Sequence, residues 1–192
     1  HKDYFCLYDE CEKLIQDTGY RPTIRIKDFF DYERKAYVSA TPLWTRNRKF
    51  LNSGFKWLKV TPDYDYKKDA TLIIPRSFNR TLRRELRRLL STSKCICIFY
   101  KTTDGIATIV QDLLENGLIK DGDYKVFCSD KSVKKLKSMK LHHTYDHLKL
   151  PLAKVNFFTS RFFSAVDVKI NKLADILVLS NYKQAVHSMI DP

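Results

Sequence analysis

The chain has 192 residues, 44% of them hydrophobic, which is enough for one ordinary domain or two small ones and excludes global disorder. The 35 Lys and Arg residues against 22 Asp and Glu give a formal net charge of +13, a sign that attracts polyanions such as nucleic acids. No apolar run reaches the roughly 18 residues that a membrane span needs, and no signal peptide is visible, so we expect no membrane partner.

The cysteine pattern predicts a reducing, cytoplasmic location. The five cysteines are odd in number, form no CxxC pair, and lie mostly in or beside apolar strand-like runs. We expect reduced, mostly buried thiols. They are Cys6, Cys11, Cys95, Cys97 and Cys128.

The first third of the chain predicts strands at residues 3–8 and 35–40, with a short helix at 10–18 between them. Residues 56–60 and 70–74 are further strand candidates.

The polar stretch 61–68, followed by Pro75, predicts a junction between two parts, residues 1–75 and 76–192.

The rest of the chain alternates helices with strands, which predicts an α/β fold with a parallel sheet covered on both faces. The expected helices cover residues 79–90, 103–117 and 132–139, and the expected strands cover residues 95–100, 124–128, 155–159 and 175–179. In such sheets ligands bind beyond the carboxyl ends of the strands.

The helix at 79–90 has leucines on one face and five arginines on the rest. The arginines could lie along phosphates or form an ordinary solvated face, and the pattern leaves both possibilities open. They are Arg80, Arg83, Arg84, Arg87 and Arg88.

Two polar motifs follow the first two expected strands. Asp9 and Glu10 form an acidic pair of the kind that holds Mg²⁺ and activates water beside a bound nucleotide, although an acidic helix start has the same composition. Ser39 and Thr41, some 30 residues on, could sense the nucleotide, or could simply cap a turn at Pro42.

In order along the chain, residues 9–12 resemble motif II of superfamily-two (DEAD/DEAH-like) helicases, residues 39–41 resemble motif III, 96–102 motif IV, and 156–167 motif V. The resemblance implies two RecA-like parallel-sheet lobes, of which the first is incomplete. It also implies ATP and Mg²⁺ as cofactors and nucleic acid as the partner.

The resemblance implies a role for each matching residue. Asp9 would bind Mg²⁺ and, with Glu10 as the general base, would be catalytic, while Ser39 and Thr41 would couple hydrolysis to lobe movement. Asp167 would approach the nucleotide. The nucleic-acid contacts would come from Lys101, Thr102, Thr159, Ser160 and Arg161.

The chain departs from the helicase pattern at three places. Ala165 and Val166 precede Asp167 where the family has a glycine, no G-x-x-x-x-G-K-[ST] phosphate loop is present, and no motif VI arginines follow. The spacing from Gly117 to Gly122 matches the loop but lacks its lysine. We therefore expect this piece alone to be inactive.

These motifs predict part of an ATP-dependent helicase or translocase, acting on DNA rather than RNA. The alternative is a non-catalytic nucleic-acid-binding scaffold with helicase-like lobes.

Two smaller groups have structural and functional interpretations. The aromatics Phe157, Phe158, Phe162 and Phe163 are expected in the core rather than stacked on bases. The histidines at 142, 143 and 147 are not expected to bind a metal, because no cysteine lies near them.

Overall fold

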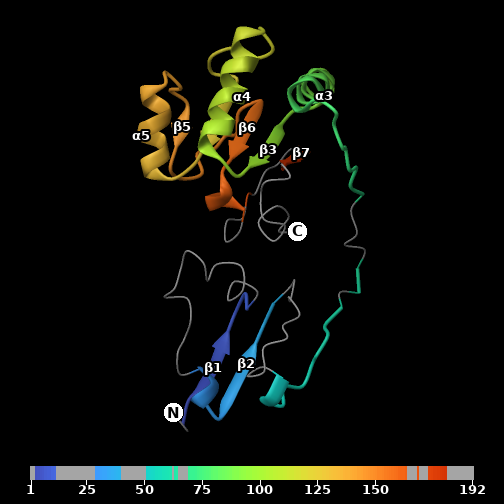
Figure 1. The fold of residues 1–192 in the computed structure, drawn as a ribbon, viewed down its shortest axis with the longest axis vertical. Helices are drawn as coiled ribbons and strands as arrows, with labels where there is room; N and C mark the ends of the chain where they lie inside the picture. The colour runs from blue at the N-terminus through green and yellow to red at the C-terminus, as the bar shows by residue number, and fades with distance from the viewer. Residues whose placement is uncertain are drawn as a thin grey trace. The chain divides into compact units, whose positions relative to one another are not determined.

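The chain divides into two compact units, residues 1–71 and 72–191, which are described separately (Figure 1). The structure is a computed structural model. It describes residues 3–11, 29–39, 51–61, 63–64, 69–163, 168 and 173–180.

The first unit contains a two-stranded parallel sheet. Strand β1 (Phe5–Tyr8) pairs with β2 (Arg34–Tyr37), and the short 3-10 helix η2 (Phe29–Asp31) precedes β2. The strands expected at 3–8 and 35–40 are confirmed. The helix expected at 10–18 lies almost entirely outside the described residues.

Aromatic side chains form the packed part of the first unit. The ring of Phe29, which is buried, lies 4.4 Å from the ring of Tyr37 and 6.2 Å from that of Tyr8. The ring of Phe55 also contacts that of Tyr37, with centroids 5.3 Å apart. Burial raises the pKa of Tyr37 well above its usual range, so its phenol stays neutral.

The two further strands expected in this region are wrong. Residues 56–60 and 70–74 have no regular secondary structure. Their apolar side chains are largely in solvent, with Leu58 88% and Ile74 86% exposed. A strand needs a partner for its backbone groups as well as suitable residues, and these segments pair with no described strand.

The second unit is built on a five-stranded parallel sheet with the order β5-β4-β6-β3-β7 (Figure 1). Its strands are β3 (Ile96–Tyr100), β4 (Tyr124–Phe127), β5 (Thr144–Tyr145), β6 (Val155–Phe158) and β7 (Asp175–Leu179). Its helices are α3 (Phe78–Thr92), α4 (Thr103–Glu115), α5 (Asp130–Ser138) and the 3-10 helix η3 (Ser160–Phe162). The expected α/β fold with a parallel sheet is confirmed.

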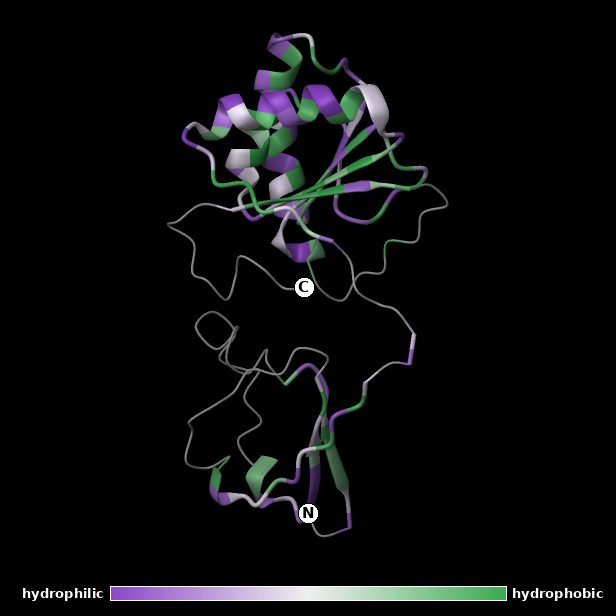
Figure 2. Cartoon of the chain, turned by 90° about the vertical axis from the view of Figure 1, so that its right-hand side faces the viewer, coloured by the Kyte–Doolittle hydropathy of each residue, from purple (hydrophilic) through white to green (hydrophobic). Residues whose placement is uncertain are grey.

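The three α-helices that the structure describes in this unit cover one face of the sheet (Figure 2). Side chains on the opposite face pack instead against loop residues and η3, through Phe127, Phe158 and Phe162. The expectation of helices on both faces is therefore corrected for the described residues. None of the helices they contain is long and apolar enough to cross a membrane.

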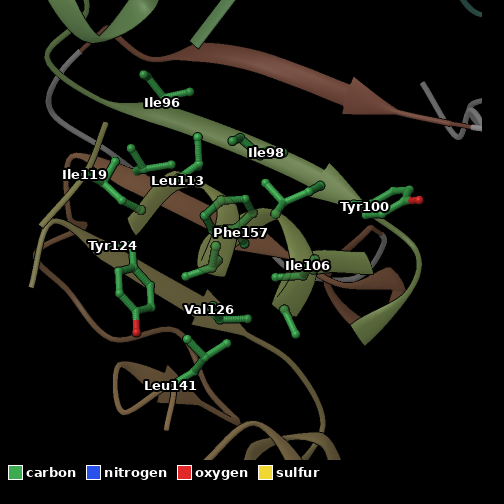
Figure 3. Close-up of a cluster of buried hydrophobic side chains, with 14 of the residues drawn as sticks. Ile96, Ile98, Tyr100, Ile106, Leu113, Ile119, Tyr124, Val126, Leu141 and Phe157 are labelled. Atoms are coloured by element: carbon green, nitrogen blue, oxygen red, sulfur yellow. The ribbon is translucent and has the colours of Figure 1, made fainter. Parts of the chain in front are cut away.

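The helix-covered face forms the main hydrophobic core (Figure 3). Ile96 and Ile98 of β3, Val126 of β4 and Phe157 of β6 are completely buried there. Alternate residues of each strand point to this face, which is the two-residue period of a strand.

One buried polar side chain connects the start of β6 to β3. The amide of Asn156 is fully buried and donates to the carbonyl oxygens of Ala153 (2.8 Å) and Ile96 (3.4 Å). Its oxygen accepts a hydrogen bond from the Ala153 backbone N–H at 3.0 Å. The amide is therefore satisfied at both ends, as a buried polar group must be.

We expect Leu86→Ala to destabilise the second unit by about 2–5 kcal/mol, because it opens a cavity at a completely buried position of α3. Leu72→Ala is the matched control, since Leu72 is 84% exposed, and it should change stability by less than about 0.5 kcal/mol. Urea unfolding followed by far-UV circular dichroism measures both. Equal losses for the two variants would contradict the assigned core.

Candidate functional site

The acidic pair of the first unit lies at the carboxyl end of β1, directly beside the end of β2. The parallel ladder continues past both strands, because Val38 N–H donates to Tyr8 O at 2.9 Å and Cys11 N–H donates to Val38 O at 3.2 Å. The backbone after Asp9 and Glu10 is therefore bonded to the residue that precedes Ser39. Two of the sequence motifs thus meet at one sheet edge.

Glu10 makes the turn that allows this contact. Its φ of 51° lies in the left-handed region, which is uncommon for a residue with a side chain. The backbone N–H of Glu10 donates to Asp9 Oδ1 at 2.9 Å, which fixes the carboxylate of Asp9. Both acidic residues are exposed, so a ligand could reach them.

The donor set at Asp9 and Glu10 suits Mg²⁺ held together with a phosphate. The described residues contain no group of three or more side chains able to hold a metal ion by themselves. Mg²⁺ is usually bound through one or two carboxylates plus substrate phosphates and waters, rather than by a complete protein cage. Two exposed carboxylates meet that requirement.

Two of the sequence-predicted site residues cannot be placed. Thr41 and Asp167 lie outside the described residues, and so do residues 164–166 before Asp167.

In the second unit, Lys101 and Thr102 follow β3 and lead into α4. Thr102 is the N-cap of α4, and its side chain accepts a hydrogen bond from Gly105 N–H at 3.3 Å. A side chain at Gly105 would collide with the ring of Tyr100 and the hydroxyl of Thr102. Lys101 and Thr102 are both exposed at the start of the helix.

Residues 159–161 follow β6, the neighbour of β3 in the sheet. Thr159 is buried, and both its N–H (3.0 Å) and its hydroxyl (3.3 Å) donate to Phe127 O. Ser160 and Arg161 are exposed. Thr159 thus anchors the segment to β4, and the next two side chains face solvent.

Sequence reasoning missed a set of hydroxyls at the same edge of the sheet. Ser129 is the N-cap of α5, and its Oγ lies 3.0 Å from Ser132 Oγ. Ser132 Oγ in turn lies 3.0 Å from Thr103 Oγ1 of α4. Ser129 follows the strand expected at 124–128, so the general rule that ligands bind beyond the carboxyl ends of strands could have selected it, whereas Lys101 and Thr159 came from the resemblance to helicase motifs.

Asp146, His147 and Arg161 lie close together beyond the carboxyl ends of β5 and β6. A hydrogen bond from His147, with a contribution from Arg161, lowers the pKa of Asp146. Burial raises the pKa of the Cys128 thiol to about 11, and the charge of Arg161 partly opposes that rise. Arg161 therefore lies close enough to act on the residues that directly follow β4 and β5.

The smaller groups named from the sequence have structural roles. Phe157, Phe158 and Phe162 are buried, which confirms their place in the core, and Phe163 is partly buried. His143 pairs with Asp121 at 3.1 Å and His147 with Asp146 at 2.8 Å.

Comparison with known proteins gave no match. No protein-family model matches the chain, and no curated protein and no solved structure is significantly similar to it.

We expect thiol reactivity to divide the five cysteines into two groups. Cys95, Cys97 and Cys128 are buried, and burial raises the pKa of Cys97 to about 12, so these thiols should resist maleimide labelling at about pH 8. Cys6 and Cys11 are partly exposed and should be labelled in the native chain. Mass spectrometry counts the labels with and without denaturant.

The same pKa values predict how stability changes with pH. The unfolded thiols titrate near 8.5, below the native values of about 12 for Cys97 and about 11 for Cys128. Stability from these two thiols is complete below pH 8.5 and should fall as the pH rises towards 11. Rapid native labelling of Cys128 would contradict both expectations.

Proposed function

We propose that the chain is part of an ATP-dependent nucleic-acid motor, a superfamily-two helicase or translocase, in which the two units are parts of two RecA-like lobes. One observation carries the proposal. Asp9 and Glu10, and then Ser39, follow neighbouring parallel strands whose carboxyl ends are joined by backbone hydrogen bonds. An acidic pair and a hydroxyl at adjacent strand ends suit a nucleotide site that passes its state to a neighbouring segment.

The chemistry proposed for the first unit uses two carboxylates with different roles. Asp9, held by the Glu10 N–H, would reach Mg²⁺ through water, and Glu10 would orient the attacking water and accept its proton. Bound Mg²⁺ would supply positive charge that stabilises the phosphates during transfer. Ser39 would respond to the nucleotide through the backbone bond between Cys11 and Val38.

The second unit would hold the nucleic acid. Lys101, Thr102, Ser160 and Arg161 are exposed at the carboxyl ends of two adjacent strands, where an extended phosphate backbone could contact all four. Thr159 would position this segment through its bonds to Phe127. We propose DNA as the substrate, because the sequence Asp9-Glu10-Cys11-Glu12 departs from the DEAD form of motif II that is common in RNA helicases.

A non-catalytic scaffold that binds nucleic acid is the second candidate. The sequence observation that favours it is the missing phosphate-binding loop among these 192 residues, together with Ala165 and Val166 where motif V has its glycine. The scaffold keeps the basic residues of the second unit and does not need Glu10. The role of Glu10 therefore separates the two candidates.

We expect ATP hydrolysis stimulated by single-stranded DNA from a polypeptide that joins these residues to a phosphate-binding loop. Glu10→Gln should lower kcat by about 10²-fold or more, because an amide cannot accept the proton of the attacking water. Glu33→Gln, at another exposed position of the first unit, is the control. The present 192 residues alone should show no turnover. A folded longer polypeptide that binds DNA without hydrolysing ATP would favour the scaffold, and hydrolysis that survives Glu10→Gln would contradict the role proposed for Glu10.

We expect Lys101→Ala with Arg161→Ala to weaken binding of single-stranded DNA and to reduce its salt dependence. Two lost phosphate contacts should lower the slope of log K against log salt by about 1.4. The matched control is Lys120→Ala with Lys137→Ala, which removes two exposed lysines from either end of the β4–α5 segment. Equal weakening by both pairs, measured by fluorescence anisotropy, would show an effect of net charge rather than of this edge.

A further inference from the structure

The outward side of α3 is strongly basic. The helix contains five arginines and one acidic residue, Glu85. Leu82, Leu86 and Leu89 are buried against the sheet and fix which side of the helix faces solvent. The arginines divide into two groups according to what they contact.

Arg83 is neutralised within the protein. Its Nε donates to Asp112 Oδ2 of α4 at 2.7 Å, and a second guanidinium nitrogen donates to the other carboxylate oxygen. This bidentate bond lowers the pKa of Asp112. Arg83 therefore holds α3 against α4.

The other four arginines form one exposed stripe, which we name the α3 stripe: Arg80, Arg84, Arg87 and Arg88. Their spacing of four, three and one residues places them on the same side of the helix, over about 12 Å of its length. In the described part of the chain, Arg80 and Arg87 have no acidic partner.

Glu85 orients the stripe more than it neutralises it. Its carboxylate pairs with Arg84 at 3.0 Å and with Arg88 at 3.1 Å. Hydrogen bonds from Arg88 and then Arg84 lower the pKa of Glu85, so it stays charged. Four arginines less one glutamate leave three positive charges on this surface.

The other exposed residues of α3 help to identify the partner. They are Asn79, Ser91 and Thr92, so the outward face carries no aromatic or aliphatic side chain. Single-stranded nucleic acid is usually held by aromatic side chains that stack on its bases, and protein partners by an apolar core. A polar stripe of guanidiniums suits phosphates alone, which a duplex presents at one charge per about 1.7 Å of its axis.

We propose that the α3 stripe binds the phosphate backbone of duplex nucleic acid, independently of base sequence, as a surface separate from the strand-end residues Lys101 and Arg161. The proposal rests on the proposed function only in taking nucleic acid as the substrate. It adds a duplex contact to an expected single-strand contact. A motor that meets a junction between duplex and single strand would use both.

The test compares three double variants of the full chain: Arg80→Gln with Arg87→Gln, Lys101→Ala with Arg161→Ala, and the control Lys120→Gln with Lys137→Gln. Fluorescence anisotropy measures binding of a duplex of about 20 base pairs and of a single strand of equal length across a salt series. The first variant should weaken duplex binding about tenfold and lower its salt slope by about 1.8. Its effect on the single strand should be less than about twofold.

Each other outcome has a distinct meaning. Unchanged duplex binding by the Arg80/Arg87 variant, with single-strand binding lost in the Lys101/Arg161 variant, overturns the α3 proposal and leaves the proposed function standing. Equal duplex loss in the Lys120/Lys137 control also overturns it, since the effect would then be net charge. Poly-glutamate that competes as well as DNA would overturn the assignment to phosphates.

Folding is controlled separately. Circular dichroism should match for all variants, because the substituted arginines are exposed. Arg80→Lys with Arg87→Lys keeps the charge and should retain the salt slope of the unsubstituted chain. If the lysine variant binds duplex as weakly as the glutamine variant, bidentate geometry rather than charge is required, which still supports a phosphate contact by these two residues.

Discussion

The parallel register of β4, β6 and β3 is the constraint on which the second unit depends. Phe127, Phe158 and Phe99 are directly opposite one another on the three strands, with ring centroids 5.0 and 4.9 Å apart. At the other end of β6, the buried amide of Asn156 bonds to Ile96 O of β3. A slip of one residue would turn every side chain of a strand to the opposite face. It would separate the three stacked phenylalanine rings and break the hydrogen bond from Asn156 to Ile96 O.

Because the parallel register is fixed, the residues that follow β3, β4 and β6 lie side by side at one edge of the sheet. Thr102 lies just beyond β3 and Thr159 directly follows β6. The Thr102 side chain accepts a hydrogen bond from Gly105 N–H, and the Thr159 hydroxyl donates to Phe127 O. Gly105 is needed at this point because Tyr100 and Thr102 occupy the space of any side chain. The rigid sheet thus fixes the backbone of two polar segments and leaves their charged side chains in solvent, which suits recognition of a phosphate backbone.

The strands of the second unit were predictable because each is a compact apolar run between polar turns. β3 was expected at 95–100 and is observed at Ile96–Tyr100. β5 was missed because Thr144–Tyr145 is only two residues long and is defined by its pairing with β4, which local composition does not encode. Residues 70–74 show the reverse case, since their composition favours a strand but no described segment supplies the partner.

For the candidate sites, the sequence predicts which residues follow a strand but not the backbone turns and hydrogen bonds around them. The position of Asp9 and Glu10 at a strand end followed from the sequence, but the left-handed turn at Glu10 and the bond from Cys11 to Val38 are properties of the fold. The hydrogen bond from the Thr159 hydroxyl to Phe127 O could not be predicted either. A sequence does not tell which of several adjacent polar residues faces the neighbouring strand.

The arginines of α3 show how structure separates two interpretations of one pattern. A basic helix face is usually a solvated surface, and the sequence alone did not decide between that and phosphate binding. The contacts assign different roles to neighbouring residues, since Arg83 is paired with Asp112 while Arg84 and Arg88 are braced by Glu85. A surface needed only for solubility requires neither this bracing nor a common side for Arg80 and Arg87, whereas binding to a regular array of phosphates benefits from both, because ordered guanidiniums lose less conformational freedom when they bind.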